Sequence, residues 1–121
     1  MAVNLSIPAD TAFIRLARLV VSGFAAQVGG TVDEIDDLRT LVDELCSMLV
    51  AQADPGDEIA LRFSSDGGAV LASVSAPARR PWSPDELAEG IVKVLADSYD
   101  VRLVDGRADL AIEKRFEPAG A

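Results

Sequence analysis

Apolar residues recur along this chain at two spacings, and the changes between them mark the elements. Residues 3–7 alternate apolar and polar positions, which predicts a short strand with one buried face, and Pro8 ends it. Three later segments carry apolar residues three and four positions apart, as amphipathic helices do. These predicted helices run from a cap at Asp10 to Val28, from Thr31 to about Ala53, and from Ser83 to about Ser98.

The first residue of each predicted helix is one that can cap it. Asp10 has a side-chain oxygen that can accept a bond from the free N–H groups of a first turn. Thr31 is followed three residues later by Glu34, and Ser83 by Glu86. This spacing is that of the capping box, in which the two residues satisfy each other's backbone donors.

The apolar stripe of each predicted helix gives its expected core face. The expected stripes are Phe13, Ala17, Val20, Val21 and Phe24 in the first helix, Ile35, Leu38, Leu41, Val42, Leu45 and Leu49 in the second, and Leu87, Ile91, Val94 and Leu95 in the third.

Two hairpins complete the predicted fold. Strands at 58–64 and 69–75 flank Asp66-Gly67, and strands at 101–104 and 108–116 flank Asp105-Gly106. Asp-Gly between alternating runs is a strong hairpin signal. The order βααββαββ predicts a two-layer α/β sandwich, a mixed and mostly antiparallel sheet with three helices covering one face. We expect one domain over residues 1–121, with 117–121 frayed.

Charge and composition narrow the function. The chain has 20 acidic and 11 basic residues, a net charge of −9, which argues against direct nucleic-acid binding and suits a basic protein partner. Half of the residues are hydrophobic, yet no run is long enough to span a membrane and the start lacks a signal-peptide pattern, so we expect a cytoplasmic protein.

Few residues suit nucleophilic or metal chemistry. The chain has no histidine, which excludes His-based catalysis and His-ligated metals. Its single cysteine, Cys46, lies in a predicted helix and is expected to be a small buried hydrophobe. The acidic cluster at 33–37 lacks the spacing of a calcium loop and suits a helix N-terminus, so we expect no metal there.

Three segments, in this order and spacing, resemble the anti-sigma factor serine kinases of the GHKL ATPase superfamily. They are RLVVSGFA at 18–25, DEIDDLRTLVDELCSMLV at 33–50 and YDVRLVDGRADLAIEKRF at 99–116. The resemblance covers nearly the whole chain and implies the histidine-kinase-like ATPase (Bergerat) fold. It also implies that Glu44 matches the family's general base and that Met48 stands where the family has its Mg²⁺-binding asparagine.

The other nucleotide motifs implied by the resemblance are degenerate. A D-x-G motif should follow the third strand, where this chain has Ala76-Pro77-Ala78, and a G-x-G motif should open the third helix, where it has Ala88-Glu89-Gly90. Only Glu44 and Gly90 survive, each with a plain alternative: a solvated helix-edge acid and a close packing point. We therefore expect no cofactor, and ATP with Mg²⁺ only if the domain is a divergent kinase.

The segment that replaces the family's nucleotide lid is Arg79-Arg80-Pro81-Trp82. Its arginines and tryptophan could stack on an adenine ring or bind an acidic partner. The alternative is a solvated loop whose Trp82 packs against the sheet.

The first helix carries Arg15, Arg18, Leu19 and Ser22 beside its core stripe. The resemblance implies that this helix meets the sigma factor and its antagonist, and Arg18 falls where an arginine often makes that contact. A solvated face with one stray leucine is the alternative.

Three functions follow from these observations. The first is an anti-sigma regulatory factor that sequesters an alternative sigma factor, is controlled by a STAS-type anti-anti-sigma protein, forms a homodimer and is not an enzyme. The second is a divergent serine/threonine kinase that phosphorylates the antagonist with Glu44 as base. The third is a pseudo-ATPase subunit with a purely structural role. The lost motifs favour the first over the second, and the arginine and leucine patch of the first helix favours it over the third.

Overall fold

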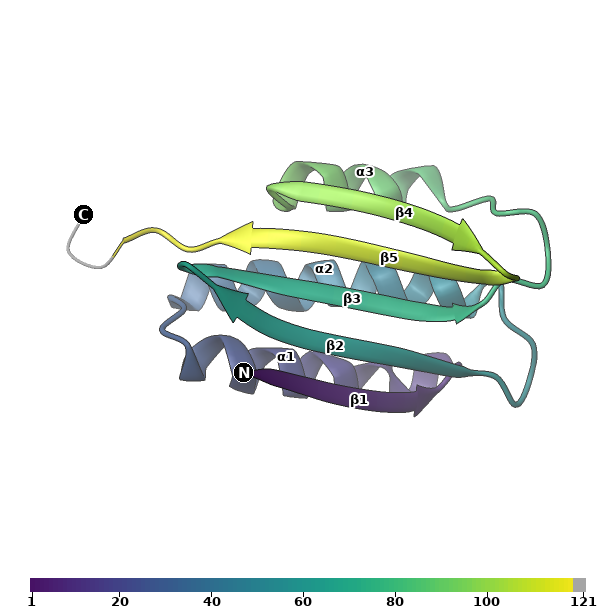
Figure 1. Cartoon of the computed structure of the whole chain (residues 1–121), viewed down its shortest axis with the longest axis horizontal. Coiled ribbons are helices and arrows are strands. Elements are labelled where there is room, and N and C mark those ends of the chain that lie inside the picture. The colour runs from purple at the N-terminus through teal and green to yellow at the C-terminus, as the bar shows by residue number, and fades with distance from the viewer. Residues whose placement is uncertain (119–121) are drawn as a thin grey trace.

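The computed structural model describes residues 1–118, in which the elements follow the predicted order (Figure 1). The strands are β1 (Ala2–Pro8), β2 (Glu58–Asp66), β3 (Ala69–Pro77), β4 (Ser98–Val104) and β5 (Arg107–Arg115). The helices are α1 (Ile14–Gln27), α2 (Val32–Val50) and α3 (Glu86–Leu95), with a 3₁₀ turn, η1 (Thr11–Phe13), before α1. None of these helices has the length and apolar character that crossing a membrane requires.

The five strands form one sheet in the order β1-β2-β3-β5-β4. All three helices lie on one face of it, with α2 between α1 and α3 (Figure 1). The predicted two-layer α/β sandwich is therefore confirmed. Each of the four strand pairings is antiparallel, so the described sheet is wholly antiparallel rather than mixed.

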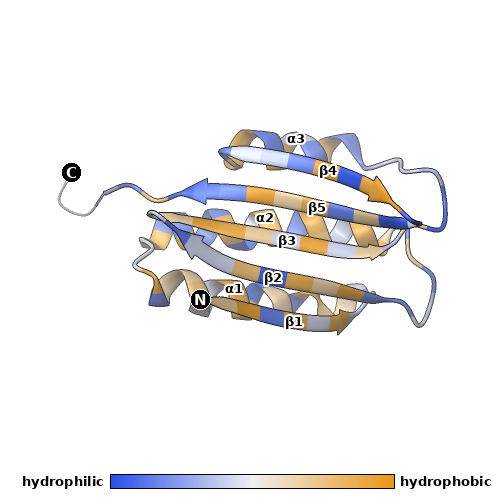
Figure 2. Ribbon diagram, in the orientation of Figure 1, coloured by the Kyte–Doolittle hydropathy of each residue, from blue (hydrophilic) through white to orange (hydrophobic). Residues whose placement is uncertain are grey.

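The core lies between α2 and the middle strands. Alternate residues of β2, Ile59, Leu61 and Phe63, face the helices and are almost fully buried. Figure 2 shows the same alternation as orange and paler positions along the strands. The predicted α2 stripe is buried at every position except Ile35, which is half-buried. Cys46 is fully buried, and burial raises the pKa of its thiol to about 12, so it is the small core hydrophobe that the sequence predicted.

The start of the first helix differs from the prediction. Asp10 caps η1 by accepting a 2.9 Å bond from the Ala12 N–H, and the α-helix begins only at Ile14. A 3₁₀ turn has three residues per turn and an α-helix 3.6, so the turn changes which of the following residues face the core. Ile14 is buried in the place expected for Phe13, which is 39% exposed.

The third helix was predicted wrongly at both ends, and its core face only in part, since Leu95 packs against the core and Ile91 is half-buried. Asp85, not Ser83, caps it through the Ala88 N–H, and it ends at Leu95 because the chain has to enter β4 at Ser98. The Ser83 carbonyl instead accepts a bond from the Gln52 side chain. The helix packs through Ala88 and Val92, while the expected core residues Leu87 and Val94 are exposed.

The segment after β5 is fixed to the start of α2. Glu34 completes the predicted capping box with Thr31, and its second carboxylate oxygen accepts a 2.7 Å bond from the Glu117 N–H. The Phe116 ring lies against Gly30, where an added Cβ would come within 3.1 Å of it. Fraying was therefore a wrong prediction for Glu117, and residues 119–121 lie outside the described part of the chain.

Glu34→Gln tests this double role. The bonds from the Thr31 N–H and the Glu117 N–H end on different carboxylate oxygens, and they lower the pKa of Glu34. An amide offers only one oxygen acceptor, so one bond must break. We expect a loss of about 1–2 kcal/mol of unfolding free energy in urea titrations. Thr31→Ser, which keeps the cap, is the control; equal midpoints for all three proteins would contradict this role.

Candidate functional site

Helix α2 has a groove along each flank, and the residues predicted to be functional, apart from Gly90, divide between the two. The first, the arginine groove, is lined by Arg15, Arg18, Leu19 and Ser22 of α1 and by Asp36, Arg39, Thr40 and Asp43 of α2. The second, the acidic groove, is lined by Glu44, Ser47, Met48 and Ala51 of α2, by Ser83 and Asp85 of the connecting loop, and by Leu87, Ala88 and Ile91 of α3.

The arginine groove brings together the four residues singled out on the first helix. The Arg18 Nε lies 3.5 Å from a carboxylate oxygen of Asp43, and both side chains are nearly half exposed. Arg39 pairs with Asp36 on the same flank of α2. Leu19 is 66% exposed beside them. With three arginines against two aspartates, this groove is a net positive surface on a chain whose net charge is −9.

The α2 side of the arginine groove was missed in the sequence. Asp36, Arg39, Thr40 and Asp43 are three and four positions apart, so they form one polar face of a helix. That spacing could have been recognised. The element that lies beside this polar face is α1, and this depends on how α1 packs against α2. The periodicity of a single helix cannot predict that packing.

Glu44 lies half-buried in the acidic groove, one turn before Met48. Burial, then the charges of Asp43 and Asp85, raise the pKa of its carboxyl. Met48 is only 2% exposed and belongs to the core. A thioether is a poor ligand for Mg²⁺, which prefers oxygen, so the donor atoms of this pair do not fit a magnesium ion.

The positions where the remaining nucleotide motifs were expected lie in a regular strand and a regular helix. Strand β3 continues through Ala76 and Pro77, which pair with Ala108 and Arg107 where a D-x-G motif was expected. Gly90 lies inside α3, where backbone N–H groups bond to carbonyls of the same helix. A Cβ added at Gly90 would meet nothing within 4 Å, so the glycine is not a close packing point either.

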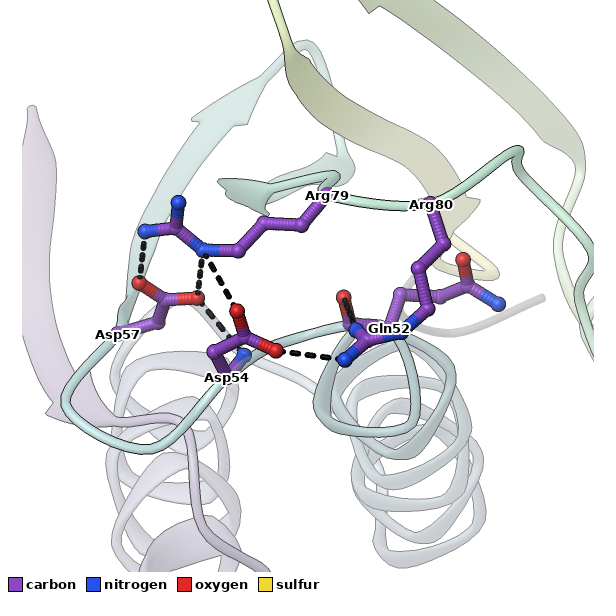
Figure 3. A network of polar contacts seen from close by, with 5 residues as sticks. All are labelled: Gln52, Asp54, Asp57, Arg79 and Arg80. Carbon is purple, nitrogen blue, oxygen red and sulfur yellow. Dashed lines mark hydrogen bonds and ion pairs between the residues drawn. The ribbon is translucent and has the colours of Figure 1, made fainter.

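The loop that replaces the lid is held by ion pairs (Figure 3). The Arg79 guanidinium donates to both carboxylate oxygens of Asp57, and Arg80 pairs with Asp54 at 2.6 Å. Arg80 also donates to the Gln52 carbonyl at the end of α2. Trp82 packs against the core, as the plainer interpretation expected. The loop is thereby attached to the turn between α2 and β2, and its arginines are already bonded to acids.

The acidic groove does not fit a nucleotide with its magnesium ion. Among the described residues that line it, none is basic, and Glu44 and Asp85 would repel phosphate oxygens. Elsewhere in residues 1–118, too, no three carboxylate or thiol side chains come together in a way that could hold a metal ion. The acidic groove has an apolar floor and a negatively charged rim. Such a surface suits a ligand that is cationic and partly apolar.

Comparison with known proteins agrees with the fold. No protein-family model matches the chain. The serine-protein kinase RsbW of Bacillus subtilis is 36% identical over 64 residues, 50% of this chain and 40% of that protein. RsbW of Bacillus licheniformis is 26% identical over 128 aligned positions, 86% of this chain and 80% of that protein.

A solved structure shares the architecture over almost the whole chain. The crystal structure of the RsbU and RsbW domains of a Mycobacterium tuberculosis protein superposes with a TM-score of 0.80 and 17% identity, over 98% of this chain and 34% of that one. The chain thus shares the α/β fold of the RsbW domain in that structure. The chain is thus similar in sequence to the RsbW serine-protein kinases, and this similarity supports the family resemblance found in its sequence. The matched segment covers only about two fifths of the Bacillus subtilis relative.

Arg79→Gln tests the clamp on the loop. The Arg79 guanidinium, above all, holds the pKa of Asp57 at about 2, below its ordinary 3.8. A lowered carboxyl pKa stabilises the folded state above the unfolded pKa, and this stability is lost as the pH falls towards 2. We expect Arg79→Gln to lower the urea midpoint at about pH 7, and the deficit to shrink below about pH 4.

Arg102→Gln is the matched control, since Arg102 is 76% exposed and its Nε is 3.8 Å from Asp100. This variant should unfold like the wild type at every pH. A constant deficit for Arg79→Gln down to the lowest pH would contradict the assigned role of Asp57.

Proposed function

We propose that this chain is an anti-sigma regulatory factor that acts by protein contact. It would sequester an alternative sigma factor and be released by a STAS-type anti-anti-sigma protein, in the cytoplasm and as a homodimer. The observation that carries the proposal is the arginine groove, which is a net positive, partly apolar surface on an acidic protein related to RsbW.

The arginine groove has the composition of a protein-binding hot spot. Arginine can form paired bonds with a carboxylate, and the exposed Leu19 beside Arg18 can shield such bonds from water. Arg18 already lies near Asp43, so an acidic partner would compete with that weak, half-exposed pair rather than bind a fully hydrated charge. The preferred partner surface is therefore acidic with an apolar centre.

Loss of ATP binding is part of the proposal. Its support is the buried Met48 in the place of a magnesium ligand, the strand that runs through Ala76-Pro77, and the two carboxylates of the acidic groove. If the protein acts in this way, neither binding nor release of the sigma factor requires a nucleotide. We expect no direct binding to nucleic acid, because the net charge is −9.

A divergent serine/threonine kinase is the second candidate. One observation favours it: Glu44 is half-buried in a groove and the pKa of its carboxyl is raised, as suits a general base. The chemistry would also need groups that hold the transferred phosphate, and the residues that line the acidic groove supply no positive charge for it.

Arg18→Glu tests the proposed contact. Reversing this charge should weaken binding to the cognate sigma factor or its antagonist by about 2–4 kcal/mol, with a smaller loss for Arg15→Glu. The measurement is calorimetry with each purified candidate partner, beside a thermal melt of each variant. Arg102→Glu, the same change on the exposed strand β4, is the control and should bind normally. Unchanged binding by a folded Arg18→Glu protein would place the contact elsewhere.

A further inference from the structure

Helix α3 presents an unpartnered apolar stripe to solvent. Leu87 is 76% exposed and Val94 is 83% exposed, with Ile91 half-buried between them. Positions 87, 91 and 94 are four and three apart, so the three side chains share one face of the helix. The adjacent face, about a quarter turn around the helix, already packs on the core through Ala88 and Val92. Folding of this domain therefore does not account for the stripe.

The stripe borders the acidic groove. Leu87 and Ile91 form one wall of it, and Met48, Ala51 and Ala88 give it an apolar floor. Glu44 and Asp85 stand on its rim, and among the described lining residues there is no basic side chain to neutralise them. Burial, then the charges of Asp43 and Asp85, raise the pKa of Glu44.

The groove is preformed. The connecting loop that supplies Ser83 and Asp85 is held by the ion pairs of Arg79 and Arg80 (Figure 3) and by the bond from Gln52 to the Ser83 carbonyl. Asp85 is itself fixed as the cap of α3. A ligand would therefore meet ordered walls, and little side-chain freedom would be lost on binding.

The chemistry of the groove selects one kind of occupant. Phosphate-bearing ligands are repelled by Glu44 and Asp85. A second copy of the chain, with a net charge of −9, is the poorer fit. A simple polyamine would leave the leucine and valine of α3 in water. A groove between two helices, apolar at its floor and acidic at its rim, matches a helix with an apolar stripe flanked by lysine or arginine.

We infer that the acidic groove and the α3 stripe form a docking site for a basic amphipathic helix of a protein partner. This site lies on the flank of α2 opposite the arginine groove, and it does not depend on the function proposed above. The domain would thus have two protein-contact surfaces of opposite charge.

The probe is a fluorescent synthetic peptide of about 18 residues, long enough to form a helix, with leucines spaced three and four apart and lysines beside them. A second peptide has every lysine replaced by glutamate. We expect saturable binding of the first peptide only, measured by fluorescence anisotropy. In ¹⁵N-labelled protein the shifted amides should lie in segments 44–51 and 83–94, and not along α1.

Two substitutions with matched controls test the assignment. Asp85→Asn removes a rim charge but keeps a good helix cap, and Leu87→Ser removes an exposed apolar side chain, so both should fold. Each should weaken binding of the lysine peptide by about tenfold. The controls are Asp100→Asn and Val32→Ser, which make the same changes at exposed positions outside the groove, and they should bind as the wild type does.

Three results would overturn the proposal. The first is equal binding of the lysine peptide by Leu87→Ser and Val32→Ser. It would mean that the peptide is held by general charge attraction and not by contact with the α3 stripe. The second is displacement of the peptide by ATP with Mg²⁺, which would make the groove a nucleotide site. The third is concentration-dependent self-association in sedimentation that Leu87→Ser abolishes, which would make the stripe a contact between copies. Arg18→Glu should leave peptide binding unchanged, so failure here is distinct from failure of the sigma-factor contact.

Discussion

The burial of α2 against the sheet is the constraint on which both candidate sites depend. Its leucines Leu38, Leu41, Leu45 and Leu49 are almost fully buried over the middle strands. Because the helix is held by this side, its two flanks are fixed in direction, one towards α1 and the other towards α3 (Figure 1). Neighbouring residues such as Asp43 and Glu44 therefore contribute to different grooves.

The two flanks have opposite electrostatic character. On the α1 side, aspartates are paired with arginines, and positive charge is left over. On the α3 side, Glu44 and Asp85 have no basic neighbour among the described lining residues, and the arginines of the connecting loop are bonded to Asp54 and Asp57 instead. These ion pairs hold the loop in place. Because Arg79 and Arg80 are bonded to aspartates, they also contribute no free positive charge to the acidic groove. The loop thus helps to make the groove unsuited to phosphate.

The sequence predicted what depends on local pattern and missed what depends on packing between elements. The capping box of Thr31 and Glu34, the two hairpins and the α2 stripe were all correct, because each rests on neighbouring residues. The core face of α3 was partly wrong: Leu95 packs against the core as expected, but Leu87 and Val94 are exposed and the smaller Ala88 and Val92 are buried in their place. The partners of Arg18 on α2 were missed because they depend on how two helices pair.

We propose that the cleft between α2 and α3, where the family resemblance implies a nucleotide site, has no affinity for phosphate. Calorimetric titration of the intact chain with ATP and Mg²⁺ tests it most directly. The lost charge-assisted contacts are worth about 1.5–3 kcal/mol each, so we expect either no heat of binding or a dissociation constant of about 1 mM or weaker. A micromolar constant would contradict the account and restore Glu44 as a candidate general base.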